Sequence, residues 1–442
     1  MNNMKIRPGF VALIGSVLAT AAAMLAFAGP LDPPPGPVAS TFKTLSDVEP
    51  RIAINSTNTP GDGATVYRIS QPGSYYLTGN LAGEANKHGI IVAVSNVTID
   101  LNGFRVSGDA ASWDGIINGT NVNAVTVRNG TVSGWNNGVN LGNVSAGEGC
   151  EVHSVNARGN RLTGVKLGLI GRATNVTAVQ NGSEGFVVGD GAIIESCAAR
   201  LNSGLGIVGG SHVRIEDTSV LSCVAGGISV GDAANITDCV ISLNGGTGVA
   251  AGSGTSVSGC TARQNNGAGF LLGSVSTVTG STAVRCTGDG FQVGSGSSVS
   301  DSSSRENTVA GFFINAGTTI SRCSAQLNQS HGIEGSADNL ILSNACDSNG
   351  ATGTGSGIEV FSDGNRIEGN NCTDNDVGIQ VNGTKSIILR NTCSNNTLNF
   401  DLAAGNRFGP IVDLTAGGTP AASGNAAPGT LLTDEANANF AY

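Results

Sequence analysis

The chain of 442 residues contains 67 glycines and ten cysteines, and only 12% of its residues are charged and 4% aromatic. Its hydrophobic content of 39% is too high for a disordered chain, and the glycines have no three-residue period, which excludes collagen. The formal net charge is −10 without runs of like charge, so neither nucleic acid nor an anionic membrane surface is the expected partner.

Residues 1–28 are predicted to be a signal peptide. Lys5 and Arg7 form a positive start, residues 10–28 are apolar or small, and Ala26-Phe27-Ala28 provides a cleavage pattern. A retained membrane anchor is the alternative, because the apolar stretch is nearly long enough to span a bilayer. No later segment has that character. We therefore expect a protein that is secreted, periplasmic or displayed on the cell surface, without a membrane span after cleavage.

Residues 29–42 are rich in proline and predict a stiff spacer, and residues 43–80 are expected to form an N-terminal cap. The region 81–404 is marked by glycines that are each followed by an apolar residue. Eight consecutive spacings between these marks are 21 residues, which chance does not produce. The marks are Gly89, Gly115, Gly138, Gly164, Gly185, Gly206, Gly227, Gly248, Gly269, Gly290, Gly311, Gly332, Gly357 and Gly378, and Asn399 closes the series.

Between the marks, apolar and polar residues alternate over three or four positions, as in β-strands. Three short strands per 21 residues, stacked in register on the next repeat, predict an all-β parallel β-helix of about 15 coils and roughly 70 Å. One inward column is Ile194, Ile215, Ile236, Val257, Val278, Val299 and Ile320. Residues 405–442 are expected to form a C-terminal cap or tail that shields the last coil.

Four residues before most marks stands an asparagine, which can bond the backbone of the coils above and below. These residues are Asn160, Asn181, Asn202, Asn244, Asn265, Asn307 and Asn328, with Cys223 and Cys286 in two of the positions. Here the chain resembles the right-handed parallel β-helix superfamily, the pectate-lyase-like fold with its asparagine ladder. The resemblance covers residues 75–400 and implies a single-stranded right-handed parallel β-helix. It does not specify a function, because that fold carries lyases, hydrolases, epimerases, tailspikes and adhesins.

The better-known catalytic motifs of this superfamily are absent. We find no Asp-Asp pair, GHG or RIK of the polygalacturonases, and no DPHD of the mannuronan epimerases. No catalytic residue is therefore transferred from the resemblance.

The even number of cysteines in a chain expected to be exported raises the possibility of disulfides. Side chains that point the same way up a stack cannot be bridged without strain, so the pattern predicts buried, reduced thiols. No cysteine spacing indicates zinc. One inward column contains Cys197, Cys239, Cys260 and Cys323, and a second contains Cys346, Cys372 and Cys393.

Charge is concentrated on one outward face of the early coils. The first twelve outward positions of the first strand in each coil hold eight titratable side chains, whereas the next ten, from Asn235 to Ser321, hold none. Insertions around Asp109–Trp113 and Leu141–Glu148 are expected beside this patch. The eight side chains are Asp100, Arg128, Glu151, His153, Arg172, Glu195, Arg214 and Glu216.

The functional interpretation of this patch is a groove for an acidic glycan. The substrate-binding residues would be Asp100, Arg128, Glu151, Arg172 and Arg214, because the planar guanidinium suits a carboxylate. The catalytic residues would be His153 as a base, with Glu195 and Glu216 sharing a proton or holding Ca²⁺. The alternative is a solvated face whose opposite charges aid stacking.

A second candidate site comprises His331, Glu334 and Glu359, beside an inserted loop at Ala351–Ser356. The two glutamates project from adjacent coils, which suits a metal or the carboxylate pair of a glycosidase. The alternative is a solvated acidic edge. His88 and His212 are interpreted as turn residues.

The sequence thus predicts an exported β-helix protein that binds or acts on an extracellular polysaccharide, with lyase- or epimerase-like action on an acidic glycan as the enzymatic form. The alternative is a non-catalytic structural or adhesive surface protein. A third idea is that the Ser/Thr rows from Asn235 to Ser321 order water. No cofactor is required by the pattern, and Ca²⁺ is the single candidate.

Overall fold

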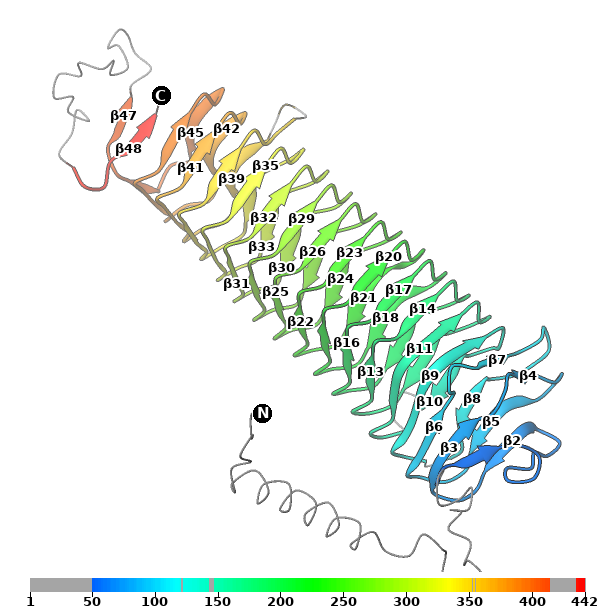
Figure 1. The fold of residues 1–442 in the computed structure, drawn as a ribbon. Coiled ribbons are helices and arrows are strands. Elements are labelled where there is room, and N and C mark those ends of the chain that lie inside the picture. The colour runs from blue at the N-terminus through cyan, green and yellow to red at the C-terminus, as the bar shows by residue number, and fades with distance from the viewer. Residues whose placement is uncertain are drawn as a thin grey trace, which may run out of the picture. The chain divides into compact units, whose positions relative to one another are not determined.

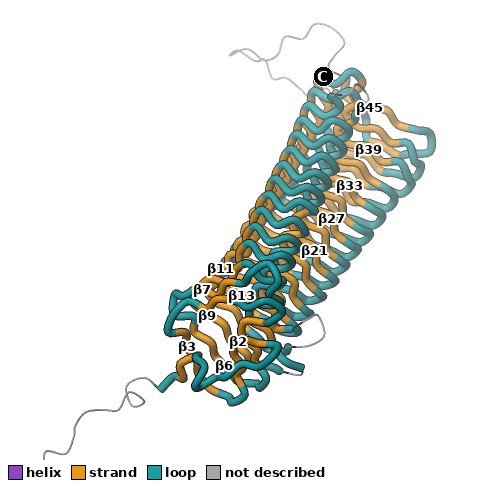
Figure 2. The backbone as a smooth tube through the Cα atoms, turned by 90° about the vertical axis from the view of Figure 1, so that its right-hand side faces the viewer, coloured by secondary structure: helices purple, strands orange, loops and turns teal. Residues whose placement is uncertain are grey.

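The computed structural model describes residues 50–120, 122–142, 147–351, 353, 355–413 and 435–441. The predicted signal peptide, spacer and first residues of the cap lie outside this part of the chain, as do most residues of the C-terminal tail. Every regular element in the described part is a β-strand, from β1 (Ile52–Ile54) to β48 (Asn439–Ala441). In the unit formed by residues 51–442 these strands wind into a long parallel solenoid (Figures 1 and 2). The predicted fold class is confirmed.

Most coils contain three strands, as in β15 (Phe186–Val188), β16 (Ile193–Glu195) and β17 (Ala198–Arg200). In two early coils one long strand, β9 (Val125–Ser133) or β11 (Glu151–Arg158), takes the place of the second and third strands. Equivalent strands pair in parallel along the molecule, and we call the three stacks the β15, β16 and β17 ladders. The β15 ladder is a separate sheet of sixteen strands, and the other two ladders belong to one sheet. A bend with a residue at positive φ, such as Ser196 at 53°, joins β16 to β17 in one coil.

The solenoid has about seventeen coils, two more than the sequence predicted. The additional strands are β1 and β2 (Thr65–Ile69) at the N-terminal end and β46 (Arg407–Phe408) at the C-terminal end. β1 pairs with β3 (Gly73–Leu77), and β2 pairs with β5 (His88–Val92). The parallel ladders therefore begin at Ile52, inside the segment that we expected to form a cap.

The interior is a stack of like side chains, as the inward columns predict. Phe270, Phe291 and Phe312 are buried on successive coils, with ring centroids 4.8 and 4.9 Å apart. All ten cysteines are free and buried, which confirms the prediction of buried thiols.

The asparagine ladder forms at the corner after the β17 ladder. The side-chain amide of Asn244 donates to Oδ1 of Asn265 at 3.0 Å and to the carbonyl of Val220 at 3.3 Å. Its Oδ1 accepts the backbone N–H of Cys223 at 2.9 Å. Each buried amide thus satisfies backbone groups that the bend would otherwise leave without partners.

A second column of hydrogen-bonded asparagines contains Asn344, Asn370 and Asn391, and the last described strand extends it. β48 pairs with β44 (Thr392–Ser394), and Oδ1 of Asn439 accepts the side-chain amide of Asn391 at 3.2 Å. The end of the chain thereby continues the ladder beyond the last complete coil. No helix in the described residues is long and apolar enough to cross a membrane.

Candidate functional site

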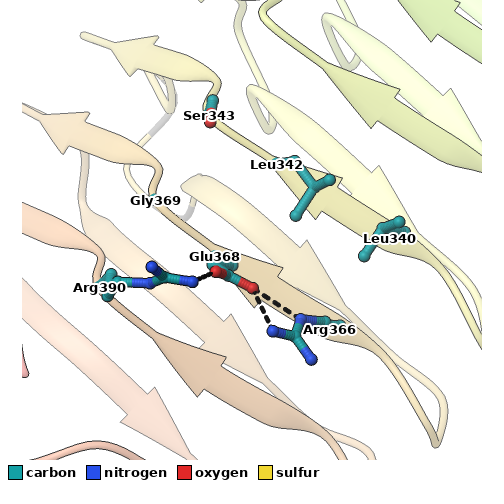
Figure 3. A pocket seen from close by; sticks show the side chains of 7 residues that line it. All are labelled: Leu340, Leu342, Ser343, Arg366, Glu368, Gly369 and Arg390. Carbon is teal, nitrogen blue, oxygen red and sulfur yellow. Dashed lines mark hydrogen bonds and ion pairs between the residues drawn. The ribbon is translucent and has the colours of Figure 1, made fainter. Parts of the chain in front are cut away.

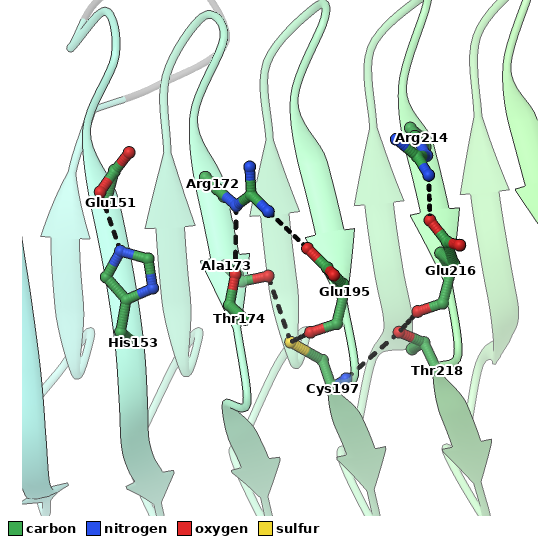
Figure 4. Close-up of polar contacts among 10 residues, drawn as sticks. All are labelled: Glu151, His153, Arg172, Ala173, Thr174, Glu195, Cys197, Arg214, Glu216 and Thr218. Atoms are coloured by element: carbon green, nitrogen blue, oxygen red, sulfur yellow. Dashed lines mark hydrogen bonds and ion pairs between the residues drawn. The ribbon is translucent and has the colours of Figure 1, made fainter.

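The charged patch of the early coils has the predicted register on the β16 ladder. Glu151 is the strand partner of Arg172, and Glu195 is the partner of Glu216, so these side chains share one outward face (Figure 4). The side chains face outward because the alternate positions, such as Ile194, fill the core.

Within this patch, each carboxylate already has a cationic or imidazole partner. Glu195 accepts a hydrogen bond from Nη2 of Arg172 at 2.5 Å, and Glu216 forms an ion pair with Arg214 of its own strand. His153 Nε2 lies 2.8 Å from Oε2 of its neighbour Glu151 (Figure 4). The structure therefore brings the predicted residues onto one face but distributes them in separate pairs.

Asp100 differs from the rest of the patch, because it is 6% exposed. Its carboxylate forms ion pairs with Arg51 and Arg128, both at 3.2 Å, and accepts the side-chain amide of Asn129 and the backbone N–H of Asn102. Asp100 and Arg128 thus hold the first coils together. Asp100 does not line an exposed groove.

The insertion at Asp109–Trp113 is not beside this patch, which corrects our expectation. It lies between β7 (Arg105–Ser107) of the β17 ladder and β8 (Ile116–Asn118) of the β15 ladder. It therefore lies at the corner between the β17 and β15 ladders, and the β16 ladder, which carries the charged patch, does not adjoin that corner. Residues 143–146 of the second insertion lie outside the described part.

The second candidate cluster lies on the outer face of the β15 ladder in the late coils. Glu334 of β36 (Ile333–Gly335) is the strand partner of Glu359 of β39 (Ser356–Val360). Ile333 and Ile358 point into the core, so the strand alternation directs both carboxylates outward.

His331 connects the two strands that carry this pair. Its Nδ1 accepts the backbone N–H of Ser356 at 3.1 Å, which leaves the ring proton on Nε2. Nε2 lies 2.9 Å from Oε2 of Glu359, and the two side chains are only 15% and 17% exposed. Asn382 donates to the other oxygen of Glu359 at 2.8 Å. The orientation of Glu359 is thus fixed from two sides.

Burial and charge shift the two carboxyl groups in opposite directions. Burial raises the pKa of Glu334, and the negative charges of Glu359 and Asp289 add to this, against the opposing effect of His331. The hydrogen bond from His331 lowers the pKa of Glu359. Burial works to lower the pKa of His331, but its bond to Glu359 and the nearby carboxylates raise it overall. Two carboxyl groups with divergent pKa values are the arrangement used for acid–base chemistry.

Two aromatic side chains next to this cluster were missed by the sequence analysis. Phe313 of β33 (Phe312–Ile314) is the strand partner of Glu334, and Phe361 follows β39 and is 43% exposed. Their ring centroids are 6.4 Å apart. Following the outward position of the β15 ladder from mark to mark would have found Phe313. We call Phe313, His331, Glu334, Glu359 and Phe361 the late cluster.

The β16 ladder carries a further charged site beyond Ser321, where the sequence analysis stopped. A pocket there is lined by two leucines and an arginine–glutamate–arginine group (Figure 3). Glu368 of β40 (Arg366–Glu368) is ion-paired with both Arg366 and Arg390 and is 14% exposed. As in the early patch, the carboxylate is neutralised by guanidinium groups.

Neither candidate site assembles an evident metal centre. The described residues contain no group of three or more His, Cys, Asp or Glu side chains placed to hold a metal ion.

Comparison with known proteins identifies the fold. A family model described as "Right handed beta helix region" matches residues 114–262 and 204–398. No curated protein sequence matches the chain significantly. Among solved structures, the A-module of mannuronan C-5 epimerase AlgE4 from Azotobacter vinelandii is 14% identical, with a TM-score of 0.35, over 76% of this chain and 90% of that one. The pectate lyase Pel9A is 16% identical, with a TM-score of 0.29, over 54% of this chain and 69% of that one. PfbA, a surface adhesin of Streptococcus pneumoniae, is 12% identical, with a TM-score of 0.22, over 74% and 85%. At these values the three solved structures carry no argument about this chain, and the family model alone identifies the fold.

Proposed function

The chain belongs to the right-handed β-helix family, and on this scaffold we propose that it is an exported protein that binds an extracellular polysaccharide and hydrolyses it at the late cluster. One observation carries the proposal. Glu334 and Glu359 stand on adjacent coils, and their pKa values are shifted apart, upward for Glu334 and downward for Glu359.

The two carboxyl groups have the properties that glycoside hydrolysis requires. Glu334, with its raised pKa, would donate a proton to the leaving glycosidic oxygen, and Glu359 would act as the ionised carboxylate. Glu334 and Glu359 are partners on neighbouring strands, so the two carboxyl groups can flank one glycosidic bond as the pair of a retaining enzyme does. Glu359 would therefore attack the anomeric carbon, and Glu334 would afterwards activate water.

The remaining residues of the late cluster support binding of a sugar. His331 and Asn382 hold Glu359 in one orientation. Phe361, with its exposed ring, and Phe313 offer apolar surfaces against which a pyranose ring can pack.

The early patch supports a second candidate function, which is lyase- or epimerase-like action on an acidic glycan. His153 lies within hydrogen-bonding distance of Glu151, and Arg172 is the strand partner of Glu151. A base beside guanidinium groups suits proton abstraction next to a uronate carboxylate, and Ca²⁺ is proposed only for this reaction. The pairing of Glu195 and Glu216 with arginines makes it the weaker candidate.

A panel of polysaccharides separates these possibilities. Xylan, glucomannan, polygalacturonate and alginate would be incubated with the protein, with and without Ca²⁺, and scored for new reducing ends and for unsaturated products. Hydrolysis at the late cluster gives reducing ends without unsaturation, and Glu334→Gln slows their formation by about 10²–10⁴-fold. Unsaturated product that depends on His153 indicates the second candidate. Folded protein that releases no product from any of the polysaccharides, whether or not it binds them, indicates a structural or adhesive role.

A further inference from the structure

The position before the repeat glycine carries a histidine in two coils, His88 and His331. In both, Nδ1 accepts the backbone N–H of the equivalent residue in the next coil, from Asp114 at 3.1 Å and from Ser356 at 3.1 Å. In both, the next coil is enlarged, to 26 residues between Gly89 and Gly115 and to 25 between Gly332 and Gly357. The structure thus repeats one local arrangement at two places along the β15 ladder.

At His88, the second ring nitrogen, Nε2, can donate a hydrogen bond to a ligand. Because Nδ1 accepts a hydrogen bond, the neutral ring carries its proton on Nε2, and no described residue accepts it. The carboxylate of Asp114 does not accept this proton. Asp114 is 7% exposed, and its two oxygens already accept hydrogen bonds from Asn137 and Asn140. His88 is therefore a partly buried residue whose Nε2–H can donate a hydrogen bond to a ligand.

Beside this donor stands an aromatic side chain, as at the late cluster. Trp113 is 39% exposed, and its ring meets that of His88 edge-on, with centroids 5.1 Å apart. An indole is large and apolar with one polar N–H, which suits the face of a sugar ring.

The loop that presents Trp113 is held rigidly. Arg161 donates to the carbonyl oxygens of Asp109 and Gly134 at 2.7 and 2.8 Å, and also to that of Ser112. The Asp109 carboxylate accepts the backbone N–H of Ser112 at 2.8 Å, which closes the turn. A preorganised aromatic side chain loses little conformational entropy when a ligand packs on it.

We propose that His88 and Trp113 form a second polysaccharide-binding subsite, in which the indole packs on a pyranose ring and the imidazole Nε2–H donates to a sugar oxygen. This proposal rests on the proposed function for the identity of the ligand. It adds a site that holds the polymer but does not cleave it, because Asp114 is fully occupied by donors.

The separation of the two sites indicates which ligands can use both. Eleven strand-to-strand steps of about 4.8 Å lie between β5 and β36, a span of roughly 50 Å along one face. A single long chain could reach both sites and gain avidity, whereas a disaccharide could occupy only one.

Tryptophan fluorescence tests the subsite directly. The chain has two tryptophans, and the other, Trp135, is fully buried, so a ligand at the subsite should perturb Trp113 alone. Each polymer of the panel and its disaccharide would be titrated into the parent and into Glu334→Gln, which binds with slowed turnover. We expect a saturable emission change for polymer and disaccharide in both proteins. Trp113→Ala should remove it and weaken polymer binding by about tenfold or more.

A matched control is Val224→Ala, at an apolar residue that is 67% exposed. It should bind polymer as the parent does. An emission that no panel polymer changes, or a Trp113→Ala protein that binds polymer like the parent, overturns the subsite even if hydrolysis is observed. Conversely, a saturable Trp113 signal without any turnover overturns the proposed hydrolysis and leaves the subsite standing.

Discussion

The early patch on the β16 ladder and the late cluster on the β15 ladder contain similar residue types in opposite physical states. In the early patch, Glu195 and Glu216 are paired with arginines, and their side chains are 36% and 30% exposed. In the late cluster, Glu334 and Glu359 have a histidine as their neighbour, and Glu359 is 17% exposed. A carboxylate that is paired with an arginine stays ionised and is already neutralised. A half-buried carboxyl group without an arginine partner can still take up and release a proton. Density of charge along a face is therefore a poorer guide to a site than the identity of the counter-charge.

The largest expected difference between the two regions is in turnover. Glu334→Gln keeps the side-chain volume but cannot donate a proton as an acid, so we expect kcat to fall by about 10²–10⁴-fold. Glu195→Gln in the early patch should change kcat by less than about threefold. Reducing-end assays on the active polysaccharide measure both, with thermal unfolding as a check on folding. Equal losses in the two variants would contradict the distinction.

The fold could be predicted from sequence because each coil must present the same inward columns to its neighbours. A repeat of 21 residues with Ile or Val at one phase leaves few alternatives to a stacked parallel helix, and the outward register of Glu195 and Glu216 followed from it. The ends could not be predicted in the same way. β1 and β2 join the ladders without the Gly-apolar mark, because pairing with a coil on one side only needs strand hydrogen bonds.

Three members of the late cluster, His331, Glu334 and Glu359, were recognised from the sequence as a set, but not as a half-buried one. The orientation of His331 and Glu359 depends on hydrogen bonds from Ser356 and from Asn382 of the next coil, which are contacts between coils that periodicity does not encode. The His88 arrangement was interpreted as a simple turn for the same reason. Its resemblance to His331 is visible only once both Nδ1 bonds are known.

The early patch and the late cluster are both held by the same solenoid core with its asparagine ladder. The next largest expected effect is the loss of stability when one asparagine of that ladder is replaced. Asn244→Leu removes the bonds to Asn265, Val220 and Cys223, so the free energy of unfolding should fall by about 1–3 kcal/mol. The control Asn266→Leu, at an exposed neighbour, should have a much smaller effect. Denaturant unfolding measures both. An unchanged midpoint for Asn244→Leu would show that the buried amide does not stabilise the bend.

The dependence of stability on pH should distinguish the late cluster from the early His88 site. The pKa of His331 is raised in the folded state, so its contribution is complete below its unfolded pKa and is lost as the pH rises through the folded value. The pKa of Glu359 is lowered, so its contribution is present above its unfolded pKa and is lost as the pH falls through the folded value. The pair should therefore stabilise the fold most between the unfolded pKa of Glu359 and the unfolded pKa of His331, by about 1–2 kcal/mol.

His88 should behave in the opposite way. Burial lowers its pKa, so protonation as the pH falls below its unfolded pKa should destabilise the fold. Unfolding of the parent, His331→Gln and His88→Gln across pH 4–9 measures both slopes. A stability difference between the parent and His331→Gln that does not vary with pH would contradict the ion pair.

The smallest expected effect is in the early patch itself. Arg172 and Arg214 are 42% and 54% exposed, and exposed ion pairs contribute about 0–1 kcal/mol each, so replacing both by alanine should leave the fold intact. The control is the double variant Ser256→Ala and Thr277→Ala, further along the same ladder. If the early patch is only a solvated face, the arginine variant and the control should show the same modest change in binding to immobilised alginate and polygalacturonate. A glycan groove predicts instead that the arginine pair loses retention at low salt while the control keeps it, because guanidinium groups that hold uronate carboxylates are screened by salt. Retention of the three proteins at two salt concentrations decides between these two states of the face. A selective loss in the arginine variant would restore the early patch as a binding site and show that its internal ion pairs open to admit a ligand.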